Sequence, residues 1–309
     1  MDQLAAMRAF VRVVEAGTFT RAADLLRAPK PTVTKHIQAL EAHLRTKLLN
    51  RTTRRVTVTP DGAAYYERAV RLLADLDELD GGMTLSQASL KGRIRIDVSA
   101  ALAMLIILPA LPEFHARYPE IQIDLGVTDR PVDLIAEHVD CVVRAGDLTD
   151  QSLIARRVGE LRFITCAAPA YLARHGEPRH PTDLEKDHYV VSYFSTRTGK
   201  AFPLSFRSKG ETVELVGRYV VSVNDGNAYL EAALVGMGVA QVPAFMAQRH
   251  LASGALQLVL TDWKTEPLPL HVVYPPNRHL SNKLRVFVDW IADLFATHDL
   301  IQRRSALGS

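Results

Sequence analysis

Residues 17–62 read GTFTRAADLLRAPKPTVTKHIQALEAHLRTKLLNRTTRRVTVTPDG. Two short helical patterns lie close together in this stretch, and an arginine-containing turn with an alternating Val/Thr segment follows them. A compact pair of helices followed by a basic hairpin is typical of proteins that place a helix in a DNA groove. The stretch therefore predicts an N-terminal DNA-binding module.

Three helices are expected in this module. Apolar residues at helical spacing predict a first helix that ends at Gly17, and Thr20 is the expected cap of a second helix that continues to residue 26. The third helix is expected over residues 30–44. One of its faces is apolar, and the other carries positive charge and hydrogen-bond donors, as a major-groove reader requires.

The polar face of the third helix has two interpretations. It is either an ordinary solvated surface or a DNA-reading surface, and the arginine-tipped hairpin that follows favours the second, because arginines there suit phosphates or the minor groove. The residues expected to contact DNA are Thr20, Lys30, Pro31, Thr32, Thr34, Lys35 and Gln38 in the helices, and Arg51, Arg54 and Arg55 in the hairpin.

Positive charge is concentrated near the N-terminus. Residues 1–59 hold 11 Lys and Arg against 4 Asp and Glu, whereas residues 60–309 hold 26 against 30. This separation fits a polyanion-binding module joined to a mildly acidic body. The first residues do not read as a secretory signal, and the most apolar run, residues 100–111, is too short to span a bilayer, so a cytoplasmic protein is expected.

A longer helical pattern begins at Pro60 and continues for about three heptads. Apolar residues at this spacing predict pairing with a second copy of the helix. The alternative is that the helix docks on its own domain. The residues expected in the dimer seam are Tyr65, Ala69, Leu72, Leu76, Leu79 and Met83.

Beyond residue 91 the pattern changes to alternating strands and helices. Strands are expected near residues 94–98, 121–127, 141–144, 189–193, 218–223, 239–242 and 271–274, and helices near 101–118, 130–138, 169–175, 228–234 and 284–295. This alternation predicts an α/β body with a doubly wound sheet, on which ligands bind at the carboxyl ends of strands.

The N-terminal region resembles the winged helix-turn-helix of LysR-type transcriptional regulators. The segments that carry the resemblance are AGTFTRAA, Thr34-Lys35-His36-Ile37, QALEAHL and LLNRTTRRVTVTPDG. Two positions depart from the family pattern: Pro29 stands where Ser is common, and Arg45 stands where Gly is common. The cap of the third helix must therefore come from elsewhere, and Arg45 must either adopt a left-handed conformation or let the helix end differently.

The resemblance extends more loosely over the body and implies a fold class of α+β and α/β with three parts. These are a winged helix-turn-helix at residues 1–59, a linker helix for dimerisation at 60–90, and a periplasmic-binding-protein-like effector domain at 91–309. Its lobe I is expected at 91–163 and 268–302, and its lobe II at 164–267. The resemblance also implies a homodimer or homotetramer on a pseudo-palindromic double-stranded DNA site, with RNA polymerase as a further candidate partner.

An effector is expected in the cleft between the lobes, where strands end beside helix N-termini. A small organic acid would suit Arg144 and two helix N-termini, although Asp225 opposes a purely anionic ligand. The alternative is that these residues are only helix caps and an internal ion pair. The residues expected to bind the effector are Ser99, Ala100, Thr128, Arg144, Phe194, Ser195, Thr196, Asn224 and Asp225.

The sequence carries no catalytic, phosphate-binding or metal-ligand motif, so no enzyme activity and no cofactor are expected. A solute-binding transport protein is opposed by the basic N-terminal module. Two alternatives stay open within the family resemblance. The cleft either binds no ligand at all, or the protein switches through a thiol at Cys141 or Cys166, although buried strand cysteines are usually small hydrophobic residues.

Overall fold

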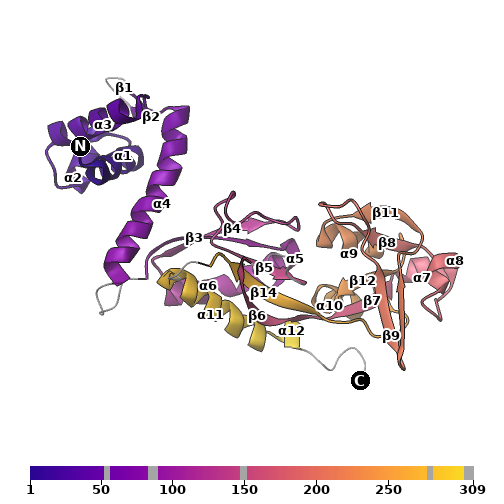
Figure 1. Ribbon diagram of the computed structural model, residues 1–309. Coiled ribbons are helices and arrows are strands. Elements are labelled where there is room, and N and C mark those ends of the chain that lie inside the picture. The colour runs from indigo at the N-terminus through magenta and orange to yellow at the C-terminus, as the bar shows by residue number, and fades with distance from the viewer. Residues whose placement is uncertain (52–55, 83–89, 147–151, 277–280, 303–309) are drawn as a thin grey trace. The chain divides into compact units, whose positions relative to one another are not determined.

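The computed structural model describes residues 1–51, 56–82, 90–146, 152–276 and 281–302. Its helices and strands, labelled in Figure 1, form two compact units, Met1–Ser89 and Leu90–Ser309. The linker helix therefore belongs to the same compact unit as the helix-turn-helix, and the α/β body forms the other unit.

The first unit packs four helices and a hairpin around one apolar core. Phe10, Ile37 and Leu40 are fully buried, and the long fourth helix adds Ala69 and Leu73 to the same core. The two strands pair antiparallel. The elements are α1 (Gln3–Ala16), α2 (Phe19–Leu25), α3 (Lys30–Leu44), β1 (Leu49–Arg51), β2 (Val56–Val58) and α4 (Pro60–Gly82).

The predicted bounds of the third helix are confirmed. It begins without a side-chain cap and ends at a left-handed residue. Pro29 precedes α3 and supplies no side-chain cap. Arg45 adopts the left-handed conformation at φ 53°, and its N–H donates to the carbonyls of Glu41 and Ala42. A left-handed non-glycine residue costs about 1–2 kcal/mol. These hydrogen bonds and the buried contacts of α3 hold Arg45 in that conformation.

The start of the second helix differs from the prediction. Thr18 is the N-cap in place of Thr20, because its hydroxyl oxygen accepts the Arg21 N–H at 3.3 Å. The chain reverses between the two helices at Gly17, which has a left-handed φ of 70°, so α2 begins two residues later, at Phe19. Thr20 lies inside the first turn of α2 and is exposed.

A buried carboxylate ties α3 to the hairpin and the start of α4. Glu41 is 4% exposed, and its Oε1 accepts hydrogen bonds from the N–H groups of Leu48 and Leu49 at 3.0 and 3.2 Å. At Gly62, in the first turn of α4, a Cβ would lie 2.0 Å from the Leu48 carbonyl oxygen. The sequence between α3 and α4 is thus held by one buried side chain and one close backbone approach.

Lobe I of the second unit is a mixed five-stranded sheet in the order β4-β3-β5-β14-β6. Helices α6 and α11 lie side by side next to it (Figure 1), and Phe114 packs against Phe287 and Trp290 between them. The elements are β3 (Gly92–Val98), α5 (Ala100–Leu102), η1 (Ala103–Ile107), α6 (Leu108–Arg117), β4 (Ile121–Val127), β5 (Cys141–Ala145), β6 (Ile154–Leu161), β14 (Leu268–Tyr274), α11 (Asn282–Thr297) and α12 (Asp299–Gln302).

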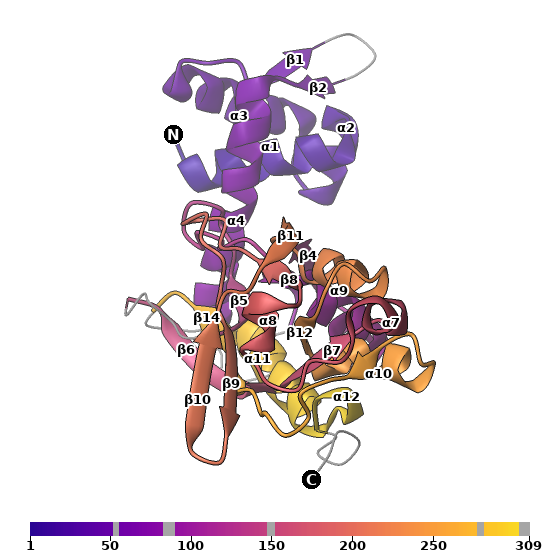
Figure 2. The same ribbon diagram turned by 90° about the vertical axis from the view of Figure 1, so that its right-hand side faces the viewer.

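Lobe II contains the sheet β12-β7-β13 and the parallel pair β11-β8. Val239 joins them through backbone hydrogen bonds with Tyr189 and Val191. The β9-β10 hairpin stands out from the lobe in Figure 2. The elements are β7 (Phe163–Ala167), α7 (Pro169–His175), α8 (Asp183–Lys186), β8 (Val190–Tyr193), β9 (Leu204–Ser208), β10 (Glu211–Leu215), β11 (Tyr219–Val223), α9 (Gly226–Leu234), β12 (Ala240–Pro243), α10 (Ala244–Ala252) and β13 (Gln257–Leu258).

One expectation for the body is corrected by the structure. Residues 130–138 form turns in place of the predicted helix: the Asp133 carboxylate caps a single turn by accepting the N–H groups of Ile135 and Ala136, and His138, left-handed at φ 53°, ends it. The lobe I sheet is mixed, since β14 runs antiparallel to both β5 and β6.

The helical segment Ala100–Arg117 has the length and hydropathy of a membrane span. Ile106, Ile107 and Phe114 on this segment are nevertheless buried in the core of lobe I. Packing inside the protein therefore accounts for these buried apolar residues, whereas Met104 and Leu108 on the same segment are exposed.

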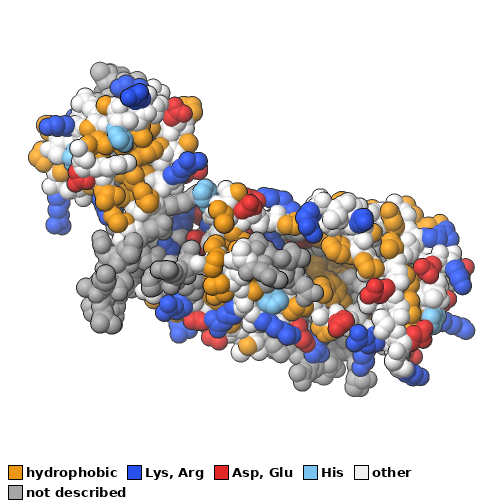
Figure 3. Space-filling view, in the orientation of Figure 1, with side chains coloured by type: hydrophobic (Ala, Val, Ile, Leu, Met, Phe, Trp, Pro, Cys, Tyr) orange, Lys and Arg blue, Asp and Glu red, His pale blue; other side chains and the backbone are white. Residues whose placement is uncertain are grey.

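Elsewhere on the second unit, Figure 3 shows acidic and basic side chains interspersed over the visible face.

Candidate functional site

Four of the expected DNA-reading residues are exposed on one side of α3. Lys30, Pro31, Lys35 and Gln38 are exposed on α3, whereas the apolar side of the helix is buried. Thr32 and Thr34 are half-buried. The Thr34 hydroxyl donates to the Lys30 carbonyl at 3.0 Å, so it offers DNA an acceptor more readily than a donor.

The expected hairpin contacts are only partly within the described residues. Arg51 is the last residue of β1, but the structure does not describe its side chain. Arg54 and Arg55 lie outside the described residues. The strands that flank them pair Leu49 with Val58 and Asn50 with Thr57. The hairpin itself is therefore present at the predicted place.

The expected dimer seam on α4 is divided between two environments. Ala69 is 2% exposed within its own unit, and the Tyr65 ring packs edge-on against Phe10 with centroids 5.6 Å apart. Leu72 is 51% exposed, and Leu76 is half-buried. The first part of the helix thus docks on its own domain, as the alternative interpretation held, and Leu72 faces away. The Leu79 side chain and Met83 lie outside the described residues.

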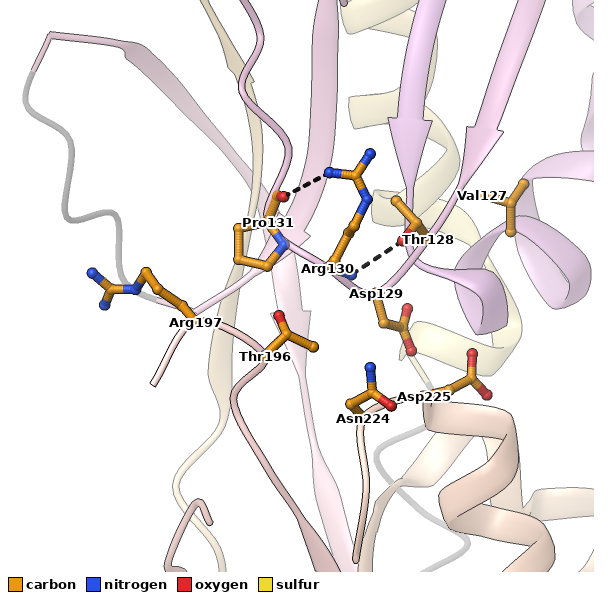
Figure 4. Close-up of a pocket in the computed structure, with 9 residues that line it drawn as sticks. All are labelled: Val127, Thr128, Asp129, Arg130, Pro131, Thr196, Arg197, Asn224 and Asp225. Atoms are coloured by element: carbon orange, nitrogen blue, oxygen red, sulfur yellow. Dashed lines mark hydrogen bonds between the residues drawn. The ribbon is translucent and has the colours of Figure 1, made fainter. Parts of the chain in front are cut away.

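A cavity of about 520 Å³ lies between the two lobes of the second unit and is shown in Figure 4. Four of the nine residues expected to bind the effector line it. They are Thr128, Thr196, Asn224 and Asp225. The other lining residues were not predicted from the sequence, and they are Val127, Asp129, Arg130, Pro131 and Arg197.

Asp129 joins the two sides of this cavity. Its Oδ1 accepts the N–H of Ala100 at 3.1 Å, and its Oδ2 accepts the N–H of Gly226 at 2.6 Å. Ala100 begins the helical segment of lobe I, and Gly226 is the first residue of α9 in lobe II. The two helix N-termini expected to hold an anionic effector are thus already bound by a carboxylate of the protein itself. Figure 4 shows the Asp129 side chain directed toward the start of α9.

The remaining expected effector residues do not line this cavity. Ser99 precedes the first helical residue without a side-chain cap bond. Phe194 pairs through its backbone with Val223 and forms a bridge with Ala201. Ser195 opens a turn that closes on Gly199 and Lys200.

Arg144 forms the internal ion pair that was the alternative to an effector contact. Its guanidinium binds the carboxylate of Asp97, whose side chain is 8% exposed. Burial raises the pKa of Asp97, and the charge and hydrogen bond of Arg144 lower it again in part. Next to this pair, Arg130 forms a bidentate ion pair with Glu137, which lowers the pKa of the Glu137 carboxyl. The cationic groups on this side of the cavity are therefore largely paired.

The two cysteines lie in different lobes, on β5 and β7, and both are 0% exposed. Burial raises the pKa of both thiols, that of Cys166 to about 12. Since the thiolate is the reactive form, neither residue has the environment of a redox-sensing cysteine.

A sequence signal for the missed lining residues was present at the end of β4. Residues 128–131 read Thr-Asp-Arg-Pro directly after an expected strand, and such polar segments commonly line ligand sites on α/β sheets. Of these residues only Thr128 was predicted, as the end of the strand.

Comparison with known proteins assigns both units. Residues 4–63 match the family described as bacterial regulatory helix-turn-helix protein, lysR family, and residues 87–296 match the LysR substrate binding domain. The chain belongs to the LysR family of transcriptional regulators. The resemblance drawn from the sequence is thereby confirmed. The protein is a DNA-binding transcriptional regulator with a substrate-binding domain, and it is not an enzyme.

LysR-family relatives from several bacteria cover nearly the whole chain. The HTH-type transcriptional regulator YhjC of Escherichia coli is 41% identical over 294 residues, which are 94% of this chain and 97% of that protein. An HTH-type transcriptional repressor of Pseudomonas aeruginosa is 39% identical, covering 98% of this chain and 95% of that protein.

Solved full-length LysR-type structures support the fold class. The Vibrio cholerae virulence activator AphB is 31% identical and superposes with a TM-score of 0.58, covering 94% of this chain and 98% of that chain. CrgA of Neisseria meningitidis is 29% identical with a TM-score of 0.59, covering 94% and 97%. The predicted combination of an N-terminal helix-turn-helix and an α/β regulatory domain is confirmed, with mixed sheets in the second.

Proposed function

We propose that this LysR-family regulator reads DNA with the exposed face of α3 and that a small organic acid in the interlobe cavity controls its transcriptional output. The observation that carries the effector part is the convergence of Thr128 from lobe I with Thr196 and Asn224 from lobe II on one cavity. A cavity of about 520 Å³ is large enough for a small metabolite. The protein would act in the cytoplasm, where promoter DNA is accessible.

The chemistry of the cavity supports an acid with further polar groups. Arg197 lines it, as does Arg130, which is paired with Glu137. Two threonine hydroxyls and the Asn224 amide can bind hydroxyl or carbonyl groups of a ligand. The two helix N-termini favour negative charge at the lobe boundary. A ligand that binds one arrangement of the lobes better than another would shift the equilibrium between them. RNA polymerase is the further partner through which such a shift would alter transcription.

Self-association is supported by apolar side chains that their own unit leaves exposed. Leu72 on α4 is 51% exposed, and Tyr219 and Val220 on β11 are 50% and 64% exposed. Within the described residues β11 pairs only with β8, so one of its edges is free. A homodimer or homotetramer on a pseudo-palindromic site would cover such surfaces.

The two alternative regulatory schemes are less well supported. A thiol switch is opposed by the complete burial of Cys141 and Cys166. A regulator with an inert cleft is opposed by the polar lining of the cavity, which a purely structural interface would not require.

Replacing Lys35 with Ala is expected to weaken operator binding, because this exposed ammonium lies on the DNA-reading face of α3. Loss of one phosphate contact should reduce the slope of log affinity against log salt by about 1, and loss of a base contact would cost about 1–3 kcal/mol. The measurement is a salt titration of binding to an operator found by genomic mapping of bound sites.

Arg12→Ala is the matched control for Lys35→Ala. Arg12 is an exposed cation of the same unit, but it lies on α1 and pairs with Glu15 at 2.8 Å. The Arg12→Ala variant should change the slope of log affinity against log salt less than Lys35→Ala does. Unchanged affinity and slope in Lys35→Ala would show that α3 is not the DNA-reading helix.

Organic acids that bind the cavity are expected to stabilise the second unit selectively. Both tryptophans of the chain, Trp263 and Trp290, lie in that unit, so their fluorescence reports its unfolding in the full-length protein. A ligand at about 100 times its Kd should add about 2.7 kcal/mol. A screen of mono- and dicarboxylic acids in which no compound raises the fluorescence-detected Tm would count against ligand control.

A further inference from the structure

The hydrogen bonds of Asp129 connect two lobes across a site where each lobe presents a helix N-terminus. Asp129 follows β4 in lobe I, and it takes one N–H from its own lobe at Ala100 and one from lobe II at Gly226. The Ala100 helix continues to Arg117, and α9 is nine residues long. Both N-termini are therefore those of substantial helices, whose partial positive charge stabilises a carboxylate.

The hydrogen bonds of the first N–H groups of α9 show that Asp129 has a role distinct from that of Asp225. The Asp225 carboxylate caps α9 from within lobe II by accepting the Ala228 N–H at 2.8 Å. The Gly226 N–H is left for a partner outside the helix, and Asp129 is that partner. A Cβ on residue 226 would lie 3.4 Å from the Asp129 Oδ2, which shows how closely the carboxylate approaches the helix end.

We propose that Asp129 is an internal ligand of the effector cavity: its carboxylate holds the lobes together in the effector-free protein, and a carboxylate effector must displace it from the two N–H groups. This inference rests on the proposed function and specifies how the effector would act. An incoming carboxylate cannot share these N–H groups with Asp129, because each has one proton to donate and the two anions repel.

The displacement has a direct structural consequence. With Asp129 bound, lobe I supplies the anion that caps α9 of lobe II. With an effector carboxylate in that place, the covalent connection between the anion and β4 is gone, so this hydrogen-bonded link between the lobes is lost. The same event that binds the effector therefore releases a lobe-to-lobe bond, which couples occupancy to lobe arrangement.

The test measures hydrogen exchange in the full-length protein without effector or DNA. In Asp129→Ala, the Ala100 and Gly226 amides should exchange about tenfold faster or more, as expected when a charge-assisted hydrogen bond of about 1.5–3 kcal/mol is lost. Acetate should restore protection at both amides in this variant by occupying the vacated site, and chloride at the same concentration should not. Acetate should leave the wild-type protein unchanged.

Asp183→Ala is the matched control for Asp129→Ala. The Asp183 carboxylate also accepts two backbone N–H groups, those of Arg179 and His180 at 2.9 Å each, but both lie in the same loop of lobe II. This variant should leave exchange at Ala100 and Gly226 unchanged. Asp129→Asn, which has one acceptor oxygen, should expose only one of the two amides, and it serves as the test if Asp129→Ala does not fold.

The outcomes separate this inference from the broader proposal. Unchanged exchange at Gly226 in Asp129→Ala, or equal acetate protection in the wild-type protein, would overturn the internal-ligand assignment even if an organic acid raises the Tm. Faster exchange with acetate rescue would support the role of Asp129 as the carboxylate that links the lobes even if every acid tested fails to raise the Tm. In that case the effector proposal, and displacement by an effector with it, would fall.

Discussion

Replacing Glu41 with Ala should lower the free energy of unfolding of the DNA-binding unit by several kcal/mol and abolish operator binding. The carboxylate is buried and accepts the N–H groups of Leu48 and Leu49, which would both be left without this partner. Each buried N–H without an acceptor costs about 1–3 kcal/mol. The junction between α3 and β1 would lose its support, and α3, which we propose reads DNA, would lose its fixed direction relative to the hairpin.

Hydrogen exchange over α3 measures this effect, and tryptophan fluorescence serves as an internal control. Because Trp263 and Trp290 both lie in the second unit, their unfolding transition should stay where it is while protection of α3 is lost. Glu41→Gln keeps one carbonyl oxygen that can accept both N–H groups, so it should cost clearly less than Glu41→Ala. Equal losses in the two variants would mean that the charge, and not the hydrogen bonds, is what the junction needs.

Replacing Asp97 with Ala should destabilise the second unit by about 3 kcal/mol or more, as is usual when one partner of a buried ion pair is removed. The variant leaves the Arg144 guanidinium, whose side chain is 20% exposed, without its carboxylate. On the neighbouring strand, Gly126 leaves room for this carboxylate, since a Cβ at that position would lie 2.6 Å from the Asp97 Oδ2. The midpoint of the tryptophan-detected urea transition should fall accordingly.

A double variant tests the physical cause of the Asp97 effect. Asp97→Ala combined with Arg144→Met removes both charges, and it should recover part of the stability lost in Asp97→Ala alone. No recovery in the double variant would show that lost packing around Asp97, and not the unpaired Arg144, is responsible.

Local sequence patterns were sufficient for most of the helices because their signals act over a few residues. The bounds of α3 followed from apolar spacing and from prolines near the first turn, and α7 was predicted at Pro169–His175 in the same way. The failure came at residues 130–138, where the Asp133 carboxylate caps a single turn and the left-handed His138 ends it. Helical spacing alone reveals neither feature.

The candidate effector site was found in part for a related reason. Thr128, Asn224 and Asp225 were recognised because each lies where a strand ends, which is a local property of the sequence. Arg144 was also recognised as a strand-end residue, but its partner Asp97 lies 47 positions away, and nothing near Arg144 in the sequence indicates the pairing.

The sequence by itself determined that this chain is a LysR-type regulator with a winged helix-turn-helix and a two-part body, because the motifs and the periodicity that carry those conclusions are contiguous. Only the tertiary structure decided that Ala69 of the linker helix packs into its own unit and that Asp129 binds the N-termini of two helices. Ala100, Asp129 and Gly226 are brought within hydrogen-bond distance by folding of the sheets, so no local pattern could have placed a carboxylate of the protein at the site expected for an effector.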